Sequence, residues 1–141
     1  MEVLLALHAL PTIMMAGLIW FVQLVHYPLF LLVGASDFVR YEREHTRRVT
    51  WIAAPLMGLE ATIAVALVIL VDGATMRLLA IAGLLLVAVI WASTAFMQAP
   101  CHRKLSVGWE ASAARRLIAT NWLRTLSWTA RACLAIVMMQ P

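Results

Sequence analysis

Charged residues are scarce in this sequence. Only 13% of its 141 residues are Asp, Glu, Lys or Arg, whereas 64% are hydrophobic. A soluble domain is about half apolar and about a quarter charged, so this composition excludes an ordinary soluble protein. The mean hydropathy of +0.90 agrees with that exclusion. We therefore interpret residues 1–141 as a single transmembrane domain, with the lipid bilayer as its principal partner.

Cysteine is scarce as well, and no basic patch stands apart from the apolar runs. Cys101 and Cys133 are the two cysteines. They fall at different depths on different apolar runs, so we expect no disulfide between them. The net charge of +4 comes from basic residues in short segments beside those runs. Membrane topology already accounts for such residues, and we expect no nucleic-acid partner.

The sequence consists mainly of long uncharged runs. The stretch from Val3 to Ser36 contains no charged residue at all. A membrane-spanning helix needs about 20 apolar residues, and a proline disfavours helix in the residue before it. With Pro28 and Pro100 as breaks, the spans fall at about 3–25, 51–71, 78–99 and 117–139. The predicted fold is all-α, an integral membrane four-helix antiparallel bundle, and the sequence leaves self-association as a homo-oligomer open.

Basic residues predict the orientation of the bundle. They lie in the first and third loops, with a single one in the second: Arg40, Arg43, Arg47, Arg48, Arg103, Lys104, Arg115 and Arg116 against Arg77. Loops rich in Lys and Arg stay in the cytoplasm. We therefore expect a multi-pass protein of the cell inner (plasma) membrane with both termini outside.

The fourth run contains the residues around which we expect the bundle to be organised. Asn121, Arg124, Trp128 and Arg131 fall within about 80° of one another on a helix. An arginine in hydrocarbon costs roughly 3 kcal/mol, so both arginines should face other helices. Glu60, the only charge of the second run, lies at the depth of Arg131 and is its predicted partner. Arg124, Glu60 and Arg131 are candidate catalytic groups, although a purely structural Glu60–Arg131 ion pair is an equal alternative.

Three histidines fall at one predicted depth near the cytoplasmic surface. His26, His45 and His102 come from three different segments. Imidazole is the commonest metal ligand and suits iron, copper and zinc, so these residues form a candidate metal site. Gln98 and Asn121 lie at the same depth and would orient the ligands. Solvated interface histidines are the alternative, with about equal weight.

Trp128 is the third candidate cofactor contact, beside Gln98 and Asn121. It lies on the same predicted helix face as Asn121 and Arg124. Tryptophans in such runs more often pack or anchor a helix at the membrane interface than stack on a cofactor. Both roles therefore stay open for Trp128 at this point.

Scattered motifs resemble those of small bacterial four-helix membrane proteins. The motifs are Gly17 to Phe30, Tyr41-x-x-x-His45, Pro55-x-Met57-x-x-Glu60, Gln98-x-Pro100-x-His102 and Asn121-Trp-x-Arg124-Thr-x-x-Trp128-x-x-Arg131. The Asn-Trp-x-Arg-Thr element is similar to that of the anthrone-oxygenase-like membrane family. This resemblance implies four spans and oxidation of a hydrophobic aromatic with oxygen. A weaker similarity, through Leu7-His8 and Lys104-Leu105, is to the HemJ-type protoporphyrinogen oxidases, which are haem-associated.

These observations favour a metal-dependent membrane oxidoreductase or oxygenase acting on an apolar aromatic or quinone-like molecule. Iron or another transition metal is the predicted cofactor, with haem as the alternative. Two other classes stay open: a non-catalytic haem- or lipophile-binding membrane protein, and a small transporter or complex subunit whose polar stripe lines a path. The sequence leaves open whether the protein is an enzyme.

Overall fold

The computed structural model describes residues 1–140, and over that range the chain is helical without strands. The elements are the helices α1 (Glu2–Phe21), α2 (Tyr27–Leu29), α3 (Ala35–Leu70), α4 (Ala74–Ser93), α5 (Ala99–Leu105) and α6 (Ala111–Met138), the π-helices η1 (Val22–His26) and η3 (Thr94–Gln98), and the 3₁₀ turn η2 (Phe30–Leu32). Because η1, α2 and η2 continue α1, and η3 and α5 continue α4, these elements form four helical rods. The predicted all-α class is confirmed.

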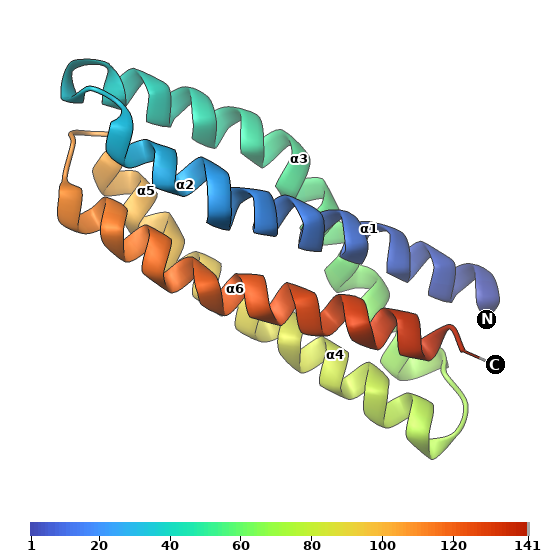
Figure 1. Cartoon of the computed structure of the whole chain (residues 1–141). Coiled ribbons are helices and arrows are strands. Elements are labelled where there is room, and N and C mark those ends of the chain that lie inside the picture. The colour runs from blue at the N-terminus through green and yellow to red at the C-terminus, as the bar shows by residue number, and fades with distance from the viewer. Residues whose placement is uncertain (141) are drawn as a thin grey trace.

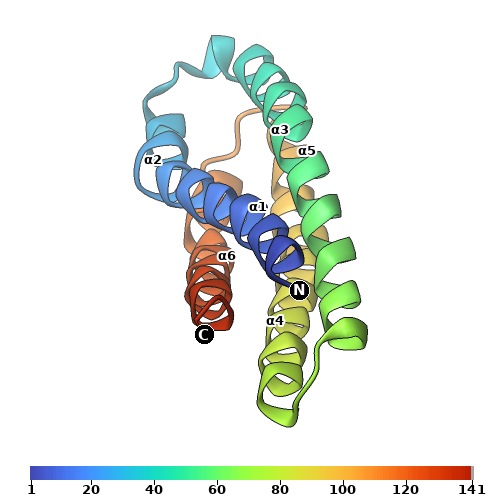
Figure 2. The ribbon, with the colours of Figure 1, turned by 90° about the vertical axis from the view of Figure 1, so that its right-hand side faces the viewer.

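The four rods form an antiparallel bundle (Figure 1). α1 packs against α3 and α6, and α4 packs against α3 and α6. In the turned view, α2 and α6 lie on the left and α3, α4 and α5 on the right, and α1 runs from α2 toward α3 (Figure 2). Both described ends of the chain lie at the same end of the bundle (Figure 1). We call this the terminal end, and the opposite one, which contains α2 and α5, the loop end.

Three of the rods are long and apolar enough to cross a membrane: Glu2–Leu32, Ala35–Leu70 and Ala74–Leu105. α6 is not among them, although the sequence predicts four spanning runs. The difference arises because α6 contains Arg115, Arg116, Arg124 and Arg131 among its 28 residues. Two of these, Arg124 and Arg131, are buried inside the bundle. α6 thus turns Arg124 and Arg131 inward, toward the other rods, whereas Arg115 and Arg116 are exposed.

The prediction that prolines end the first and third rods is wrong. The chain stays helical through Pro28 and Pro100, and in each case a five-residue π segment comes just before the proline. There Tyr27 N–H donates to Val22 O, and Ala99 N–H donates to Thr94 O, each five residues back. A proline lacks an N–H and its ring strikes the preceding turn. The wider turn relieves that conflict, so the helix continues.

One tight turn follows the sequence closely. Asp72 and Gly73 join α3 to α4, as their residue types predict. Gly73 has a φ of +82°, which an L side chain rarely adopts. This turn closes the terminal end and fixes the antiparallel arrangement of α3 and α4.

A layer of apolar side chains crosses the middle of the bundle. It is formed by buried residues of all four rods: Met15, Ala16, Ile19, Met57, Ile90 and Trp128. Polar networks lie on both sides of it, toward the loop end and toward the terminal end. On the first rod, buried Met15 of this layer lies between buried Thr12 and buried Gln23, so the layer separates the polar side chains of that rod.

Candidate functional site

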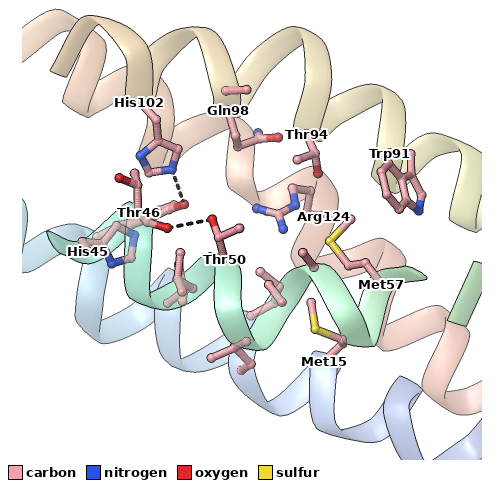
Figure 3. Close-up of a pocket in the computed structure, with 18 of the residues that line it drawn as sticks. Met15, His45, Thr46, Thr50, Met57, Trp91, Thr94, Gln98, His102 and Arg124 are labelled. Atoms are coloured by element: carbon pink, nitrogen blue, oxygen red, sulfur yellow. Dashed lines mark hydrogen bonds between the residues drawn. The ribbon is translucent and has the colours of Figure 1, made fainter. Parts of the chain in front are cut away.

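The site lies in a cavity of about 550 Å³ between α1, α3, α6 and the η3–α5 segment. Most of its wall is apolar and includes Met15, Ile19, Val49, Ala53 and Met57. The polar groups that line it are few, and in Figure 3 the labelled ones run from His45 and His102 at one end to Trp91 at the other. Ligand cavities in proteins commonly combine an apolar wall with a few placed polar groups, and this volume is in their usual range.

Arg124 supplies the positive charge of this cavity. Its guanidinium points into the space between Gln98 and Met57 (Figure 3), and the residue is only 7% exposed. Nη1 donates to Asn121 Oδ1 at 3.2 Å, whereas Nε has no partner. No carboxylate of residues 1–140 lies within salt-bridge distance of it. A buried charge without a counter-charge is costly, so this arrangement favours a ligand oxygen opposite Arg124.

A second polar group of the cavity is a hydrogen-bonded chain of Glu42, His102 and Tyr27. His102 Nδ1 lies 2.5 Å from Glu42 Oε1, and His102 Nε2 lies 3.0 Å from the Tyr27 hydroxyl. Glu42 is fully buried and Tyr27 nearly so. The carboxylate can only accept when ionised, which places a proton on Nδ1 and leaves Nε2 to exchange a proton with Tyr27. This is the carboxylate–imidazole–hydroxyl order that acid–base sites use.

The three predicted histidines meet at the loop end. His26 Nε2 lies 2.6 Å from His45 Nδ1. The ring centroids of His45 and His102 are 5.7 Å apart. Four segments contribute to this cluster, because Glu42 and His45 come from α3, His26 from η1, Tyr27 from α2 and His102 from α5. The prediction that these three histidines lie close together is confirmed.

The geometry does not support the predicted metal. Among residues 1–140, no group of three or more His, Cys, Asp or Glu side chains is arranged to hold a metal ion. His26 and His45 direct a nitrogen at each other, and both nitrogens of His102 have other partners. Three nitrogens therefore do not face one point, as a metal would require. Iron, other transition metals and haem stay predictions.

The other predicted cofactor contacts have partners of their own. Gln98 Nε2 donates to Thr120 Oγ1 at 3.1 Å, and Gln98 Oε1 accepts from Ser93. Asn121 Nδ2 donates to Gln23 Oε1 at 2.9 Å while its oxygen accepts from Arg124. Asn121 thus positions Arg124, both amides join rods, and neither bonds a histidine.

Trp128 lies away from the cavity wall, in the apolar layer. Its ring is 1% exposed and packs with Met15, Met57 and Ile90. Its indole nitrogen has no hydrogen-bond partner among residues 1–140. This placement gives Trp128 a packing position rather than a contact with the contents of the cavity.

Glu60 and Arg131 form the second polar network, on the terminal side of the apolar layer. Arg131 Nε donates to Glu60 Oε1 at 2.6 Å, and Thr12 Oγ1 donates to the same oxygen at 2.6 Å. The predicted Glu60–Arg131 pair is confirmed. Arg131 Nη2 also lies 2.5 Å from His8 Nε2. An arginine only donates, so His8 Nε2 accepts and the imidazole is neutral, with its proton on Nδ1. Nothing in this network lines the main cavity.

Sequence reasoning missed two residues of the site, Tyr27 and Glu42. Glu42 was visible as a neighbour of His45 at the spacing of one helical turn, but its hydrogen-bond partner is His102, 60 residues further along the chain. Tyr27 directly precedes Pro28, where a break in the helix was expected. A signal existed for both, since each is next to or near a predicted site histidine. Their pairing depends on how three rods meet, which a single sequence does not show.

No protein-family model, curated protein or solved structure matches this chain. The resemblances to the anthrone-oxygenase-like family and to the HemJ-type oxidases therefore stay predictions.

Proposed function

We propose that this protein is a membrane-embedded oxidoreductase that binds an apolar aromatic or quinone-like molecule in the cavity and exchanges protons with the oxygen of that molecule. The membrane part of the proposal is supported by three rods of sufficient length and hydropathy. It is also supported by the outward-facing apolar side chains along them, such as Leu10, Ile69 and Leu85. α6 crosses as the fourth rod, because its two buried arginines face the other rods rather than lipid.

Arg124 is the observation that carries the proposal. A buried guanidinium without a carboxylate, in a cavity with a mostly apolar wall, fits a ligand with an apolar body and one electron-rich oxygen. A quinone carbonyl or a phenolate oxygen has that character. Arg124 lines the cavity and its Nε has no hydrogen-bond partner, so its guanidinium has donor capacity left for that oxygen. Charge-assisted hydrogen bonds of this kind are roughly twice as strong as neutral ones.

Proton exchange is the step that the remaining polar residues suit. Reduction of a quinone takes two electrons and two protons, and the first electron leaves an oxyanion that Arg124 would stabilise. Tyr27 lines the cavity and can give its hydroxyl proton to such an oxygen. When His102 is doubly protonated, as an imidazolium paired with Glu42, it returns its Nε2 proton to Tyr27 and keeps its Nδ1 proton on the hydrogen bond to Glu42. A reduced redox partner supplies the electrons, and dithionite can replace it in a test.

A non-catalytic lipophile-binding protein is the second candidate. The cavity and Arg124 alone suffice for binding, and no group of residues 1–140 is arranged to hold a redox metal. A transporter path fits less well, because the apolar layer around Met15, Met57 and Trp128 separates the two polar networks.

The proposal is tested by quinone binding in detergent. A short-tailed naphthoquinone should quench tryptophan fluorescence, because Trp91 lines the cavity. Arg124→Gln should weaken binding about tenfold or more, which corresponds to about 1.4 kcal/mol. Arg115→Gln is the matched control on the same helix, since Arg115 is exposed. Equal affinities for the wild type and Arg124→Gln would refute the proposed site.

The same sample separates the oxidoreductase from a passive binding protein. During a dithionite titration, a site that stabilises the oxyanion should show the semiquinone radical by electron paramagnetic resonance. Arg124→Gln should lose that signal. A protein that binds the quinone tightly but shows no radical in either form would favour non-catalytic binding.

A further inference from the structure

A second cavity of about 420 Å³ lies between α1 and α3 at the loop end. Its wall combines apolar side chains with His26, Tyr41, Glu44 and Arg48. Arg48 is exposed and Glu44 partly exposed, and the two side chains bond each other at 3.1 Å. Water therefore reaches the charged rim of this second cavity, which we call the outer groove.

His45 belongs to the walls of both the outer groove and the main cavity. The two cavities share four lining residues, and three of them, Leu18, Val22 and Val49, are apolar. His45 is thus the one titratable side chain among residues 1–140 that lines both. Any proton that passes directly between the two cavities through a side chain must pass through this imidazole.

The hydrogen bonds of His45 suit such a transfer. Its Nδ1 lies 2.6 Å from His26 Nε2, and His26 lines the outer groove. Its Nε2 is buried and has no partner among residues 1–140. If His26 Nε2–H donates to His45 Nδ1, then neutral His45 holds its proton on Nε2, at the nitrogen without an acceptor. A buried donor without an acceptor is costly unless something supplies one.

We propose that the hydrogen-bonded pair His26–His45 is a proton port, which carries protons from the outer groove to the ligand in the main cavity. A proton from water binds His26 Nδ1, the Nε2 proton moves to His45 Nδ1, and His45 releases its Nε2 proton to the ligand oxygen or to the His102–Tyr27 pair. One proton enters and one leaves, so charge balances. After the transfer both imidazoles hold their proton on Nδ1, and proton exchange with water restores the starting Nε2 tautomers.

Charged and titratable groups on both sides suit this direction of transfer. Tyr41, Glu44 and Arg48 line the outer groove beside the pair. On the inner side, Glu42 holds His102 at 2.5 Å and Arg124 attracts an oxyanion that then takes up the proton. The proposal rests on the proposed function for its acceptor, but the port itself exists without a ligand.

The transfer can be followed with an alkylated nitrophenol, whose phenolate absorbs visible light. With the phenolate bound in the cavity, a rapid drop in pH should bleach it as the proton arrives. His26→Gln and His45→Gln should each slow this step about tenfold or more, because an amide bonds but does not relay a proton. His8→Gln, in the Glu60–Arg131 network, is the control and should keep the wild-type rate. Added free imidazole should restore the rate in His26→Gln, which a merely structural role would not produce.

A measurement without ligand tests the proton port independently of the proposed function. With ¹⁵N-labelled histidine, the wild type should show a scalar coupling between His26 Nε2 and His45 Nδ1 across the hydrogen bond, and His26→Gln should slow exchange of the His45 ring proton with water. Absence of that coupling, or bleaching at the wild-type rate in His26→Gln, would overturn the port. A nitrophenol that fails to bind while the coupling is present would count against the proposed function and leave the port in place.

Discussion

The charges of the two buried arginines of α6 are compensated in opposite ways. Arg131 has Glu60, Thr12 and His8 around its charge, and the network is complete except for Glu60 Oε2 and His8 Nδ1. Arg124 has an amide and an empty Nε. Burial is costly for both, so the difference lies in where the compensating group comes from. For Arg131 it is the protein, and for Arg124 we propose that it is the ligand.

The Glu60–Arg131 pair should matter for stability rather than for ligand binding. Glu60→Gln leaves Arg131 buried without a counter-charge, at a cost of about 3–5 kcal/mol. We expect a lower melting temperature in detergent, and partial recovery when Arg131→Met is added to Glu60→Gln. Thermal unfolding followed by circular dichroism measures both.

Quinone affinity serves as the control for this pair, because neither Glu60 nor Arg131 lines the main cavity. The folded fraction of Glu60→Gln should bind naphthoquinone like the wild type. A double variant no more stable than the single one would contradict a pairing role. A single variant that melts normally yet loses ligand binding would instead give Glu60 a functional role.

At the scale of the element, small backbone features position the charged groups. Gly83 of α4 faces Arg131, and a Cβ built on it would lie 2.6 Å from Arg131 Nη1. The guanidinium cannot easily move aside, because Glu60 and His8 hold it on the other side. The π segments position polar side chains at the loop end, since η1 includes His26 and η3 includes Gln98. π-bulges are frequent at functional sites for this reason.

Gly83→Ala should therefore destabilise the bundle, although alanine favours a helix over glycine by about 1 kcal/mol. The added methyl group displaces the Arg131 guanidinium from Glu60. Gly17→Ala and Gly58→Ala are matched controls, because a Cβ at either position meets nothing within 4 Å. Melting temperatures should fall for Gly83→Ala and stay level or rise for the controls. Equal melting temperatures for Gly83→Ala and Gly58→Ala would show that the close approach of Gly83 to Arg131 does not affect stability.

Hydropathy and periodicity predicted the elements better than their ends. The four apolar runs and the turn at Gly73 follow from the sequence, because length, charge and residue type act locally there. The continuation of the helices through Pro28 and Pro100 was not predictable from the sequence. A proline favours the end of a helix, whereas packing along the whole rod favours its continuation, and the π turn accommodates both. The Glu60–Arg131 pair was predictable because only one acid and one base lie at that depth. Tyr27 and Glu42 were not, since several partners were available at the loop end.

At the scale of the whole molecule, the bundle separates two polar networks by an apolar layer. The network at the terminal end, around Glu60, is closed and lines no large cavity. The one at the loop end borders both cavities, and its polar groups are only partly paired. We infer that the first network holds the rods together and that the second is where a ligand and protons meet. The sequence indicated two such layers by depth, but the cavity between the rods required the structure.

The central claim is that an apolar ligand binds with its oxygen on Arg124. It is tested most directly by a cycle of two ligands and two proteins: an alkylated nitrophenolate and its methyl ether, each titrated calorimetrically into the wild type and Arg124→Gln. We expect the wild type to prefer the phenolate about tenfold or more, which corresponds to about 1.4 kcal/mol of coupling. Arg124→Gln should bind both ligands with nearly equal affinity. A preference for the phenolate that persists unchanged in Arg124→Gln would contradict the account.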